Sequence, residues 1–483
     1  RRLIRVVSPC WNAAGDLQAN LDALARIDLG GKPNHPDLAI SVVVVDNASE
    51  PPLESQIRVP RNLDVEFVRL PTNTGGSGGY NAGMAHALAV GRRTGLPAEF
   101  VWLLDSDAKP EPGALVGLVR AMDAYEQFVA VGSSIANPDT GEVFEIGGKL
   151  DPLLGQYHAM YSETKPPPTR TAEVVYAAAC SLLVRADAIE QVGLFPDVFL
   201  NGDDIEWCVR LAEQTGMKIG ATQDSLVRHP CFKHGATVVR YYVARNAFGP
   251  IDALKLGWRV RLARALREIP RALAQTMIGR DDLAELHIKG LADAASNRLF
   301  GPAPEGTLTF DRFEPMERLG RALHEFNLPA SATVWVHPKL RLDEPVANEA
   351  ESQFAACGLP TPTIERGEYI LERESMFTGL AAAMLRLVRR PKATIALVPC
   401  RGRPNAWARG TIQIELAPGG FIIRELNRPR MLKNALSVSC RGVILAVRLM
   451  LRRPERDHTK RLTPARPQPT REPKAPGTVG IAS

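Results

Sequence analysis

The stretch Phe100-Val-Trp-Leu-Leu104 runs directly into Asp105-Ser106-Asp107. Its uninterrupted apolar character predicts a strand with both faces covered, and the acidic triplet predicts a turn at the carboxyl end of that strand. Two carboxylates at positions i and i+2 of a turn can point at one ion, and Mg²⁺ and Mn²⁺ prefer oxygen ligands. Such carboxylates also occupy ordinary turns and helix caps, so the triplet alone allows both interpretations.

The residues before this stretch alternate between strand-like and helix-like patterns. A repeated β-α-β order predicts an α/β fold with a doubly wound, mostly parallel sheet that has helices on both faces. The expected strands are 3–7, 40–45, 65–70 and 100–104, and the expected helices are 14–27 and 79–92.

A polar motif follows each of these predicted strands. Ser8-Pro9 follows the first, Asp46-Asn47 the second, the segment 73–81 the third and Asp105 the fourth. Ligands of doubly wound sheets bind beyond the carboxyl ends of the strands. We therefore expect these motifs to converge on one edge and form the binding site there.

The segment Asn73-Thr-Gly-Gly-Ser-Gly-Gly-Tyr-Asn-Ala-Gly83 joins a strand to a helix. Its glycines allow positive φ and close backbone approach, so amide groups and the helix N-terminus can face a ribose or a phosphate. The alternative is a flexible turn. The segment is neither a Rossmann fingerprint, because it follows the third strand, nor a P-loop, because no Gly-Lys-Ser/Thr ends it.

A second acidic group, Asp203-Asp204-Ile-Glu206, opens a predicted helix that contains Arg210. One of these carboxylates could accept the proton of an acceptor hydroxyl. The alternative is a helix N-terminus in which Asp203 or Asp204 is the cap, Glu206 completes a capping box and Arg210 is its ion-pair partner.

His229 and His234 follow this helix and a short predicted strand. An imidazole can complete the coordination of a Mn²⁺-type ion that Asp105 and Asp107 begin. A lone histidine in a loop is more often only solvated, so this prediction depends on the company of the two aspartates.

Together these motifs resemble the inverting family-two glycosyltransferases of GT-A fold, and among them the bacterial galactofuranosyl- and rhamnosyltransferases. The similarity covers roughly residues 1–300. The motifs that carry it, in order, are Val42-Val-Val-Val-Asp46-Asn-Ala-Ser49, Asn73 to Gly83, Trp102-Leu-Leu-Asp105-x-Asp107, Asp203-Asp204-x-Glu206-x-x-x-Arg210, His229 and Tyr241-Tyr-x-x-Arg245-Asn246.

The resemblance implies a role for each matching residue. Asp105 and Asp107 would face the donor diphosphate, and they would hold Mn²⁺ or Mg²⁺ together with His229. Asp204 would be the general base, with Asp203 and Glu206 orienting the acceptor. Asp46 would contact the nucleotide base or ribose. The full set predicted to bind the donor is Pro9, Asp46, Asn73, Gly75, Gly76, Gly78, Gly79, Asn81 and Asp105.

The resemblance also implies the substrates. The donor would be UDP-galactofuranose or dTDP-rhamnose, and the paired glycines of 75–79 favour the former. The acceptor would be a glycan or a polyprenyl-linked glycan of the cell envelope. The sequence departs from the galactofuranosyl pattern at Ser106 and at Arg228, where a tryptophan is usual, and the second departure leaves His229 and His234 both open as the metal ligand.

Two rival classes have less support. A nucleotide-sugar-binding protein without catalysis would need a broken acidic set, and this set is intact. A nucleotidyltransferase usually has a basic, glycine-rich loop after its first strand, and Ser8-Pro-Cys-Trp-Asn12 is neither basic nor glycine-rich.

The 483 residues are too many for one ordinary core, and the pattern predicts several parts. Beyond the catalytic domain the expected strands 333–336 and 393–398, the helices 346–356 and 376–388, and a hairpin of 411–416 with 421–426 suggest a small α/β module, in which His337 is expected to be structural. The predicted division is a catalytic domain (1–250), a helical extension (251–300), the module (307–427), an amphipathic basic helix (428–453) and a disordered tail (454–483).

Positive charge is concentrated near the end of the chain. Residues 428–474 contain 13 Lys/Arg and 3 Asp/Glu, a net charge of +10, so the rest carries −4 of the total of +6. This distribution argues against a nucleic-acid-binding catalytic domain and favours a tail that meets an anionic surface. The helix 431–451 contains three cations, so we expect it to lie in a membrane interface rather than to span the bilayer. No leader is visible and the seven cysteines are scattered, which predicts a cytoplasmic protein, peripheral on the inner face of the plasma membrane, with oligomerisation left open.

Overall fold

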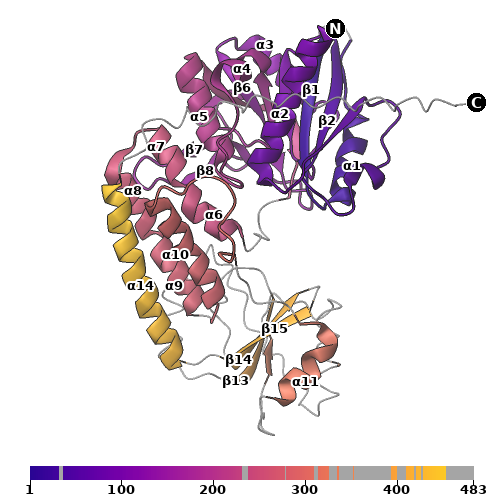
Figure 1. Ribbon diagram of the computed structural model, residues 1–483. Coiled ribbons are helices and arrows are strands. Elements are labelled where there is room, and N and C mark those ends of the chain that lie inside the picture. Colours follow the sequence, from indigo (N-terminus) through magenta and orange to yellow (C-terminus); the bar gives the residue numbers. More distant parts are fainter. Residues whose placement is uncertain are drawn as a thin grey trace, which may run out of the picture.

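The computed structural model describes residues 1–31, 36–230, 238–277, 279–308, 314–325, 334–336, 352, 393–399, 410–417, 420–425 and 428–452 (Figure 1). The predicted helix 376–388, the helix 346–356 apart from Ser352, the tail 454–483, His234 and His337 lie outside these residues.

Eleven of the described strands form one large sheet, whose main order is β3-β2-β1-β4-β10-β6-β11-β5. β7 and β8 extend it from β6, and β9 pairs with β11. The strands are β1 (Arg2–Cys10), β2 (Leu38–Asp46), β3 (Val65–Arg69), β4 (Phe100–Leu104), β5 (Lys109–Pro110), β6 (Phe128–Ala136), β7 (Val143–Leu150), β8 (Tyr157–Tyr161), β9 (Thr171–Val174), β10 (Ser181–Arg185) and β11 (Lys218–Arg228).

The first half of the sheet is parallel, as the sequence predicts. β1 lies between β2 and β4, and β3 adds to β2, all parallel. β10 then pairs antiparallel with both β4 and β6. The sheet is therefore mixed beyond β4, because the chain inserts β10 between two strands that came earlier in the sequence.

Helices cover both faces, because alternate residues of the buried strands point to opposite sides. Val7, Val43 and Val45 pack beneath α2 (Gly75–Thr94), α4 (Ala186–Val192) and α5 (Asp203–Thr215). The neighbouring residues Val6, Val42 and Val44 face α1 (Ala14–Leu24) and α3 (Ala114–Ala124). The expected α/β fold with two covered faces is confirmed.

A group of helices follows the sheet, as Figure 1 shows below it. It contains α6 (Val239–Asn246), α7 (Phe248–Ala253), α8 (Gly257–Leu266), α9 (Glu268–Thr276) and α10 (Asp281–Ala295). The long helix α14 (Arg428–Leu451) lies along these helices, and Val438, Leu445, Ala446 and Leu449 join their core. The segment nearest the end of the described chain thus completes a core begun near residue 250.

α14 differs from its prediction in one respect. By length and composition alone, Pro429–Leu451 could cross a membrane, in spite of its cations, and 28% of its most apolar stretch is buried in the structure. One side of the helix packs on α8, α9 and α10, while large apolar side chains such as Leu436 and Val447 remain exposed.

A second sheet of four described strands has the order β12-β13-β14-β15. These are β12 (Val334–Val336), β13 (Ala393–Pro399), β14 (Gly410–Ala417) and β15 (Gly420–Glu425), and the short helix α11 (Leu319–His324) precedes them. β14 and β15 pair antiparallel, which confirms the predicted hairpin. The division of the chain into domains remains a prediction.

Candidate functional site

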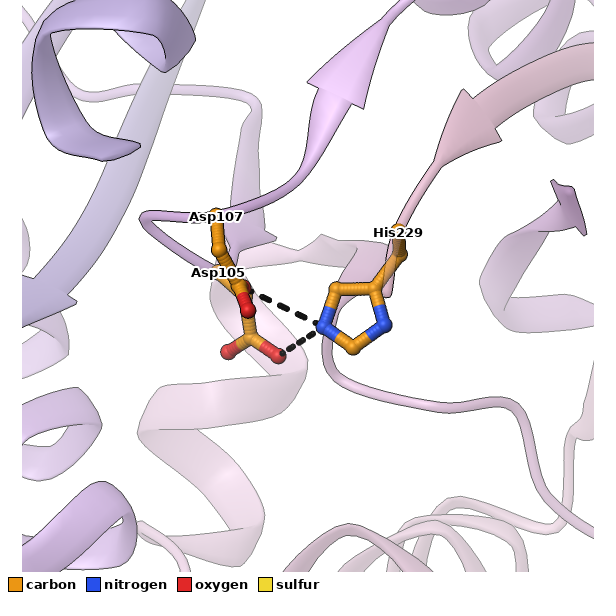
Figure 2. Close-up of side chains that lie close together, drawn as sticks. All are labelled: Asp105, Asp107 and His229. Atoms are coloured by element: carbon orange, nitrogen blue, oxygen red, sulfur yellow. Dashed lines mark ion pairs between the residues drawn. The ribbon is translucent and has the colours of Figure 1, made fainter. Parts of the chain in front are cut away.

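Asp105, Asp107 and His229 converge at the carboxyl ends of β4 and β11 (Figure 2). His229 Nε2 lies 3.3 Å from Asp105 Oδ2 and 3.2 Å from Asp107 Oδ1. One ligand atom from each residue lies within 4.8 Å of those of the other two. Two carboxylates and an imidazole at this spacing fit an ion of the Mn²⁺ or Mg²⁺ type.

The electrostatics of this cluster indicate a place for a cation. Burial alone would lower the pKa of His229, but the carboxylates of Asp105 and Asp107 outweigh it and raise that pKa to about 10. Burial likewise opposes ionisation of Asp107, yet hydrogen bonding to His229 leaves the pKa of Asp107 lowered. A positive charge next to the two carboxylates is therefore favourable, and a protonated imidazole or a metal ion can supply it.

His229 is held in place by its backbone. The imidazole is almost fully buried, and the N–H of His229 donates to the carbonyl of Ala136 on β6 at 3.0 Å. His234 lies outside the described residues, so the choice between the two histidines rests on the position of His229 alone.

The turn at Ala179 and Cys180 connects the metal cluster to the second acidic group. The N–H of Asp105 donates to the carbonyl of Cys180 at 3.2 Å, and the N–H of Ala179 donates to Asp204 Oδ2 at 3.1 Å. The hydroxyl of Tyr80 lies 2.6 Å from Asp105 Oδ1 and 3.0 Å from the Ala179 carbonyl. The two acidic groups, distant in sequence, are therefore neighbours in one site.

Asp203 and Asp204 are the first two residues of α5. The N-cap is Gly202, with φ of 89°, and no side chain caps the helix, so the alternative prediction of Asp203 or Asp204 as the cap is wrong. Glycine occupies this left-handed conformation at little cost, which frees both carboxylates from a capping role. Burial raises the pKa of Asp204 to about 6 and, with the charge of Asp204, that of Asp203 to about 8.

Glu206 lies one turn further along α5 and pairs with Arg210. Arg210 Nε donates to Glu206 Oε1 at 3.0 Å, and its Nη groups donate to the carbonyls of Val192 and Leu194. Both side chains are mostly buried. The predicted ion pair is present, and the proposed contact of Glu206 with an acceptor remains a prediction.

The glycine segment forms the start of α2, four residues earlier than the expected helix at residue 79. Asn47 holds this turn, because its Oδ1 accepts from the N–H of Thr74 and its Nδ2 donates to the Gly75 carbonyl, both at 2.9 Å. Asn73 Oδ1 accepts from the N–H of Gly75 at 2.8 Å. Gly75 has φ of 73°, and a Cβ there would lie 2.0 Å from the Phe199 carbonyl oxygen, so only glycine fits.

The remaining residues of the predicted donor pocket line this start of α2. A Cβ at Gly79 would lie 2.7 Å from Pro9 at the end of β1, and one at Gly78 would meet Thr74, whereas one at Gly76 would make only ordinary contacts with Leu200 and Phe199. Asn81 exchanges two hydrogen bonds with the backbone of Phe195, which ties α2 to the segment before Asp203. Donor contacts of these residues remain predictions.

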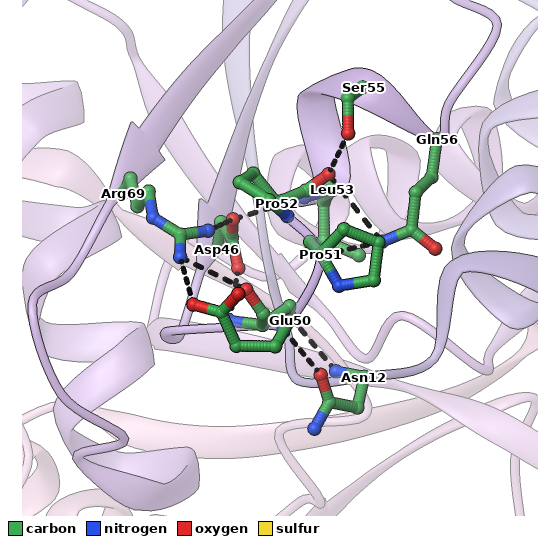
Figure 3. Close-up of polar contacts among 10 residues, drawn as sticks. Asn12, Asp46, Glu50, Pro51, Pro52, Leu53, Ser55, Gln56 and Arg69 are labelled. Carbon is green, nitrogen blue, oxygen red and sulfur yellow. Dashed lines mark hydrogen bonds and ion pairs between the residues drawn. The ribbon is translucent and has the colours of Figure 1, made fainter.

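Asp46 is buried within a network at the end of β2, drawn in Figure 3. Its carboxylate accepts from the N–H groups of Ser49 and Leu53 at 2.8 and 3.1 Å, and from Arg69 Nη1 at 2.5 Å. Burial opposes ionisation, but these hydrogen bonds leave the pKa of Asp46 lowered. The carboxylate thus shapes the loop after β2, and its predicted contact with the nucleotide remains a prediction.

The sequence interpretation missed Arg69, Tyr80, Glu145 and Tyr157. Glu145, on β7, has its Oε1 buried without a hydrogen-bond partner among the described residues, and burial followed by the charge of Asp204 raises its pKa to about 7. The Tyr157 hydroxyl lies 2.5 Å from Asn201 Oδ1. A carboxylate inside the strand-like run Val143-Phe-Glu145-Ile146 was the available signal for Glu145.

Comparison with known proteins gives several relatives by sequence, including the following two. The chain is 26% identical over 223 residues to galactofuranosyltransferase GlfT1 of Mycolicibacterium smegmatis, a match that spans 44% of this chain and 67% of that protein. It is 28% identical over 253 residues to pre-mycofactocin glycosyltransferase of Mycobacterium tuberculosis, spanning 51% of this chain and 46% of that protein. The chain thus spans two thirds of the first relative and less than half of the second.

Solved structures give more distant matches. GalNAc-T7 with UDP, GalNAc and Mn²⁺ aligns at 13% identity with a TM-score of 0.39, covering 56% of this chain and 51% of that one. S. aureus TarS 1-349 in complex with UDP-GlcNAc aligns at 15% identity with the same TM-score, covering 61% and 81%.

The family description "Glycosyl transferase family 2" matches residues 5–193, a range that includes β1 to β10, the glycine segment and the Asp105-Ser106-Asp107 turn. That range carries the parallel half of the sheet and two of the three residues of the metal cluster. Residues 5–193 of the chain are accordingly similar to the family 2 glycosyltransferases.

Proposed function

We propose that the chain is an inverting, metal-dependent glycosyltransferase that moves a sugar from a nucleoside diphosphate to a hydroxyl of a glycan or lipid-linked glycan. The observation that carries this proposal is the pair of hydrogen bonds at Ala179 and Cys180, which join Asp204 and Asp105 across one turn. A proton acceptor thereby lies beside the candidate metal cluster, as a single displacement requires.

Each group in the site has a task in this reaction. Asp105, Asp107 and His229 would hold Mn²⁺ or Mg²⁺, which supplies positive charge against the departing diphosphate. The amides at the start of α2 face the same charge. Asp204 takes the proton of the acceptor hydroxyl. At the same time the hydroxyl oxygen bonds to the anomeric carbon of the donor sugar and the bond from that carbon to the diphosphate breaks, which inverts the configuration.

Galactofuranose is the favoured sugar, with UDP-galactofuranose as the donor. It is supported by the sequence motifs and by the similarity to galactofuranosyltransferase GlfT1 of M. smegmatis. The alternative donor is dTDP-rhamnose. A panel of sugar nucleotides, tested for Mn²⁺-dependent thermal stabilisation of the full chain, distinguishes them because a ligand that binds the native state raises its Tm.

Substitution of the proposed base tests the mechanism. Asp204→Asn should lower the transfer rate by on the order of 10²–10⁴-fold, because proton removal is lost, while Mn²⁺-dependent donor binding stays close to that of the wild type. Asp139→Asn, at the exposed turn between β6 and β7, is the matched control and should keep full activity. Retained turnover in Asp204→Asn would rule out the assigned base.

Substitution in the metal cluster tests donor binding separately. Asp107→Asn should raise at least tenfold the donor concentration needed for Mn²⁺-dependent thermal stabilisation, since one charged ligand of the ion is removed. An unchanged metal requirement in Asp107→Asn would contradict the placement of the metal.

We also propose that the enzyme is cytoplasmic and binds the anionic inner face of the plasma membrane through α14. Six large apolar side chains of this helix are exposed, and the cations between them complement an anionic surface. The exposed apolar residues are Leu432, Leu436, Val443, Ile444, Val447 and Leu451.

A further inference from the structure

Five arginines gather where α6, α8, α9 and α10 meet: Arg240, Arg264, Arg267, Arg271 and Arg280, hereafter the arginine cluster. The family match ends before them, at residue 193. None of them was among the site residues predicted from the sequence.

Three members of the cluster have carboxylate partners. Arg264 and Arg271 both pair with Oε1 of Glu268, which is fully buried, and Arg280 Nε donates to Asp282 Oδ1 at 3.0 Å. Glu268 Oε2 is hydrogen-bonded to His287 Nδ1 at 2.6 Å. Burial lowers the pKa of His287, so this imidazole adds no positive charge at neutral pH.

The guanidinium groups of Arg240 and Arg267 form no hydrogen bond or ion pair with any described residue, and the Nε atom of each is buried. Burial and then the neighbouring Arg280 guanidinium lower the pKa of Arg240 to about 10. Burial and then Arg271 lower the pKa of Arg267. Arg240 and Arg267 are partly exposed as whole residues, yet each has a buried Nε donor without a partner. An unsatisfied buried donor on a cation is unfavourable, so this pair indicates an anionic ligand.

The arginine cluster lies on the acceptor side of the proposed active site. Tyr157, at the start of β8, donates to Asn201, two residues before Asp203. Burial raises the pKa of Tyr157 to about 12, and the charges of both Arg264 and Asp204 act at its hydroxyl. This hydroxyl is therefore close enough to both the proposed base and the cluster to feel the charge of each.

Exposed apolar side chains border the cluster. Leu266, which precedes Arg267, is 42% exposed. Asp151, whose charge acts on Arg267, is followed by Leu153 and Leu154, which are 76% and 37% exposed. Guanidinium groups bind phosphate oxygens through paired N–H donors, and an apolar border suits a hydrocarbon chain attached to that phosphate.

We propose that the arginine cluster binds the diphosphate of a lipid-linked acceptor, through Arg240, Arg267 and Arg271, and so presents the acceptor sugar to Asp204. That the bound molecule is an acceptor rests on the proposed glycosyl transfer. The anion site itself is independent of the donor site, because no member of the cluster belongs to the Asp105, Asp107 and His229 group.

Thermal unfolding of the full chain in EDTA tests the proposal, with farnesyl diphosphate below its critical micelle concentration as the probe. Without metal the donor site should not hold a diphosphate, so a rise in Tm of a few degrees reports the arginine cluster. Farnesol and inorganic pyrophosphate are the matched probes that lack the charge or the chain. We expect the Tm of both wild type and Asp107→Asn to rise with farnesyl diphosphate and not with farnesol. The affinity for farnesyl diphosphate should be at least tenfold higher than that for pyrophosphate.

The double variant Arg240→Gln/Arg267→Gln should lose this response and should have a higher Tm than wild type without ligand, because two unpaired, partly buried guanidinium groups are removed. The control Arg93→Gln/Arg120→Gln, which removes the same charge from exposed positions on α2 and α3, should respond as wild type does. A full response in Arg240→Gln/Arg267→Gln, or equal affinity for pyrophosphate, would overturn the proposal.

Two further measurements separate related outcomes. Loss of binding to phosphatidylglycerol vesicles in Arg240→Gln/Arg267→Gln, with no response to farnesyl diphosphate in wild type, would assign the cluster to lipid headgroups and overturn the acceptor site. If the wild type shows no Mn²⁺-dependent donor binding but responds to farnesyl diphosphate, the result would count against the proposed transferase function and would still support the anion site.

Discussion

At the scale of single residues, the proposed acceptor side of the site holds three carboxyl groups whose pKa burial raises: Glu145, Asp203 and Asp204. Burial disfavours the charged form of each, and the charge of a neighbouring carboxylate disfavours it further. A raised pKa near neutrality suits a proton acceptor, because the group can then both take and return a proton.

These raised pKa values predict how stability changes with pH. The pKa of Asp203 is raised to about 8, against about 3.9 in an unfolded chain, so its contribution to stability is complete below pH ~4 and is lost as pH rises through 8. Asp203→Asn cannot ionise. In EDTA we therefore expect the Tm of Asp203→Asn minus that of wild type to increase by a few degrees between pH 5 and pH 9.

Asp139→Asn again provides the control, because it makes the same change at an exposed turn away from the site. A constant difference for Asp203→Asn across the same range would show that Asp203 ionises in the native state as readily as in the unfolded chain.

At the scale of elements, α2 lies unusually close to the sheet. A Cβ at Gly83 would lie 2.2 Å from Val7 Cγ1 and 3.0 Å from Val45 Cγ2, on two adjacent strands. Glycine at this position lets the helix settle on β1 and β2, and the same approach brings its first turn beside Pro9. The glycines of α2 therefore serve packing as well as ligand access.

Gly83→Ala should destabilise the protein by about 1–3 kcal/mol, because the added methyl overpacks a close contact. Gly15→Ala on α1 is the matched control. Its Cβ would meet nothing within 4 Å, so alanine should stabilise by up to about 1 kcal/mol through helix propensity. Urea unfolding midpoints measure both, and a neutral or stabilising Gly83→Ala would show that α2 can shift away from the strands.

Periodicity was sufficient to predict the strands up to β4, because each of them contains a short, mostly apolar run such as Val42-Val-Val-Val45 of β2. It could not predict β10, whose place between β4 and β6 depends on pairing between segments distant in sequence. The candidate metal cluster was predictable from residue types and order. Tyr80 and Glu145 were not, because only the folded chain brings the Tyr80 hydroxyl to Asp105 and the Glu145 carboxylate near Asp204.

At the scale of the whole molecule, α14 has two apolar sides. Val438, Leu445 and Leu449 pack into the helical group, while Leu436 and Val447 lie exposed. The packed side means that deleting the helix would open a core. A test of membrane binding therefore requires substitutions on the exposed side alone.

Leu436→Asn/Val447→Asn should lower binding to phosphatidylglycerol vesicles at least tenfold in a sedimentation assay, because the apolar surface that enters the interface is reduced. Neither side chain belongs to the buried core, so the Tm should change little. Ser437→Asn, also exposed on α14, is the control. Unchanged binding would place the membrane contact elsewhere.

Arg452, just past the end of α14, forms a buried ion pair with Asp252, two hundred residues earlier in the chain. A ribosome delivers Asp252 and the surrounding apolar helices long before α14 emerges. Until then the core of the helical group lacks the side chains of α14, and Asp252 lacks its ion pair with Arg452. The nascent chain should therefore need protection by a chaperone until α14 is synthesised, and chains that end before residue 428 should aggregate even though the proposed site residues are all present.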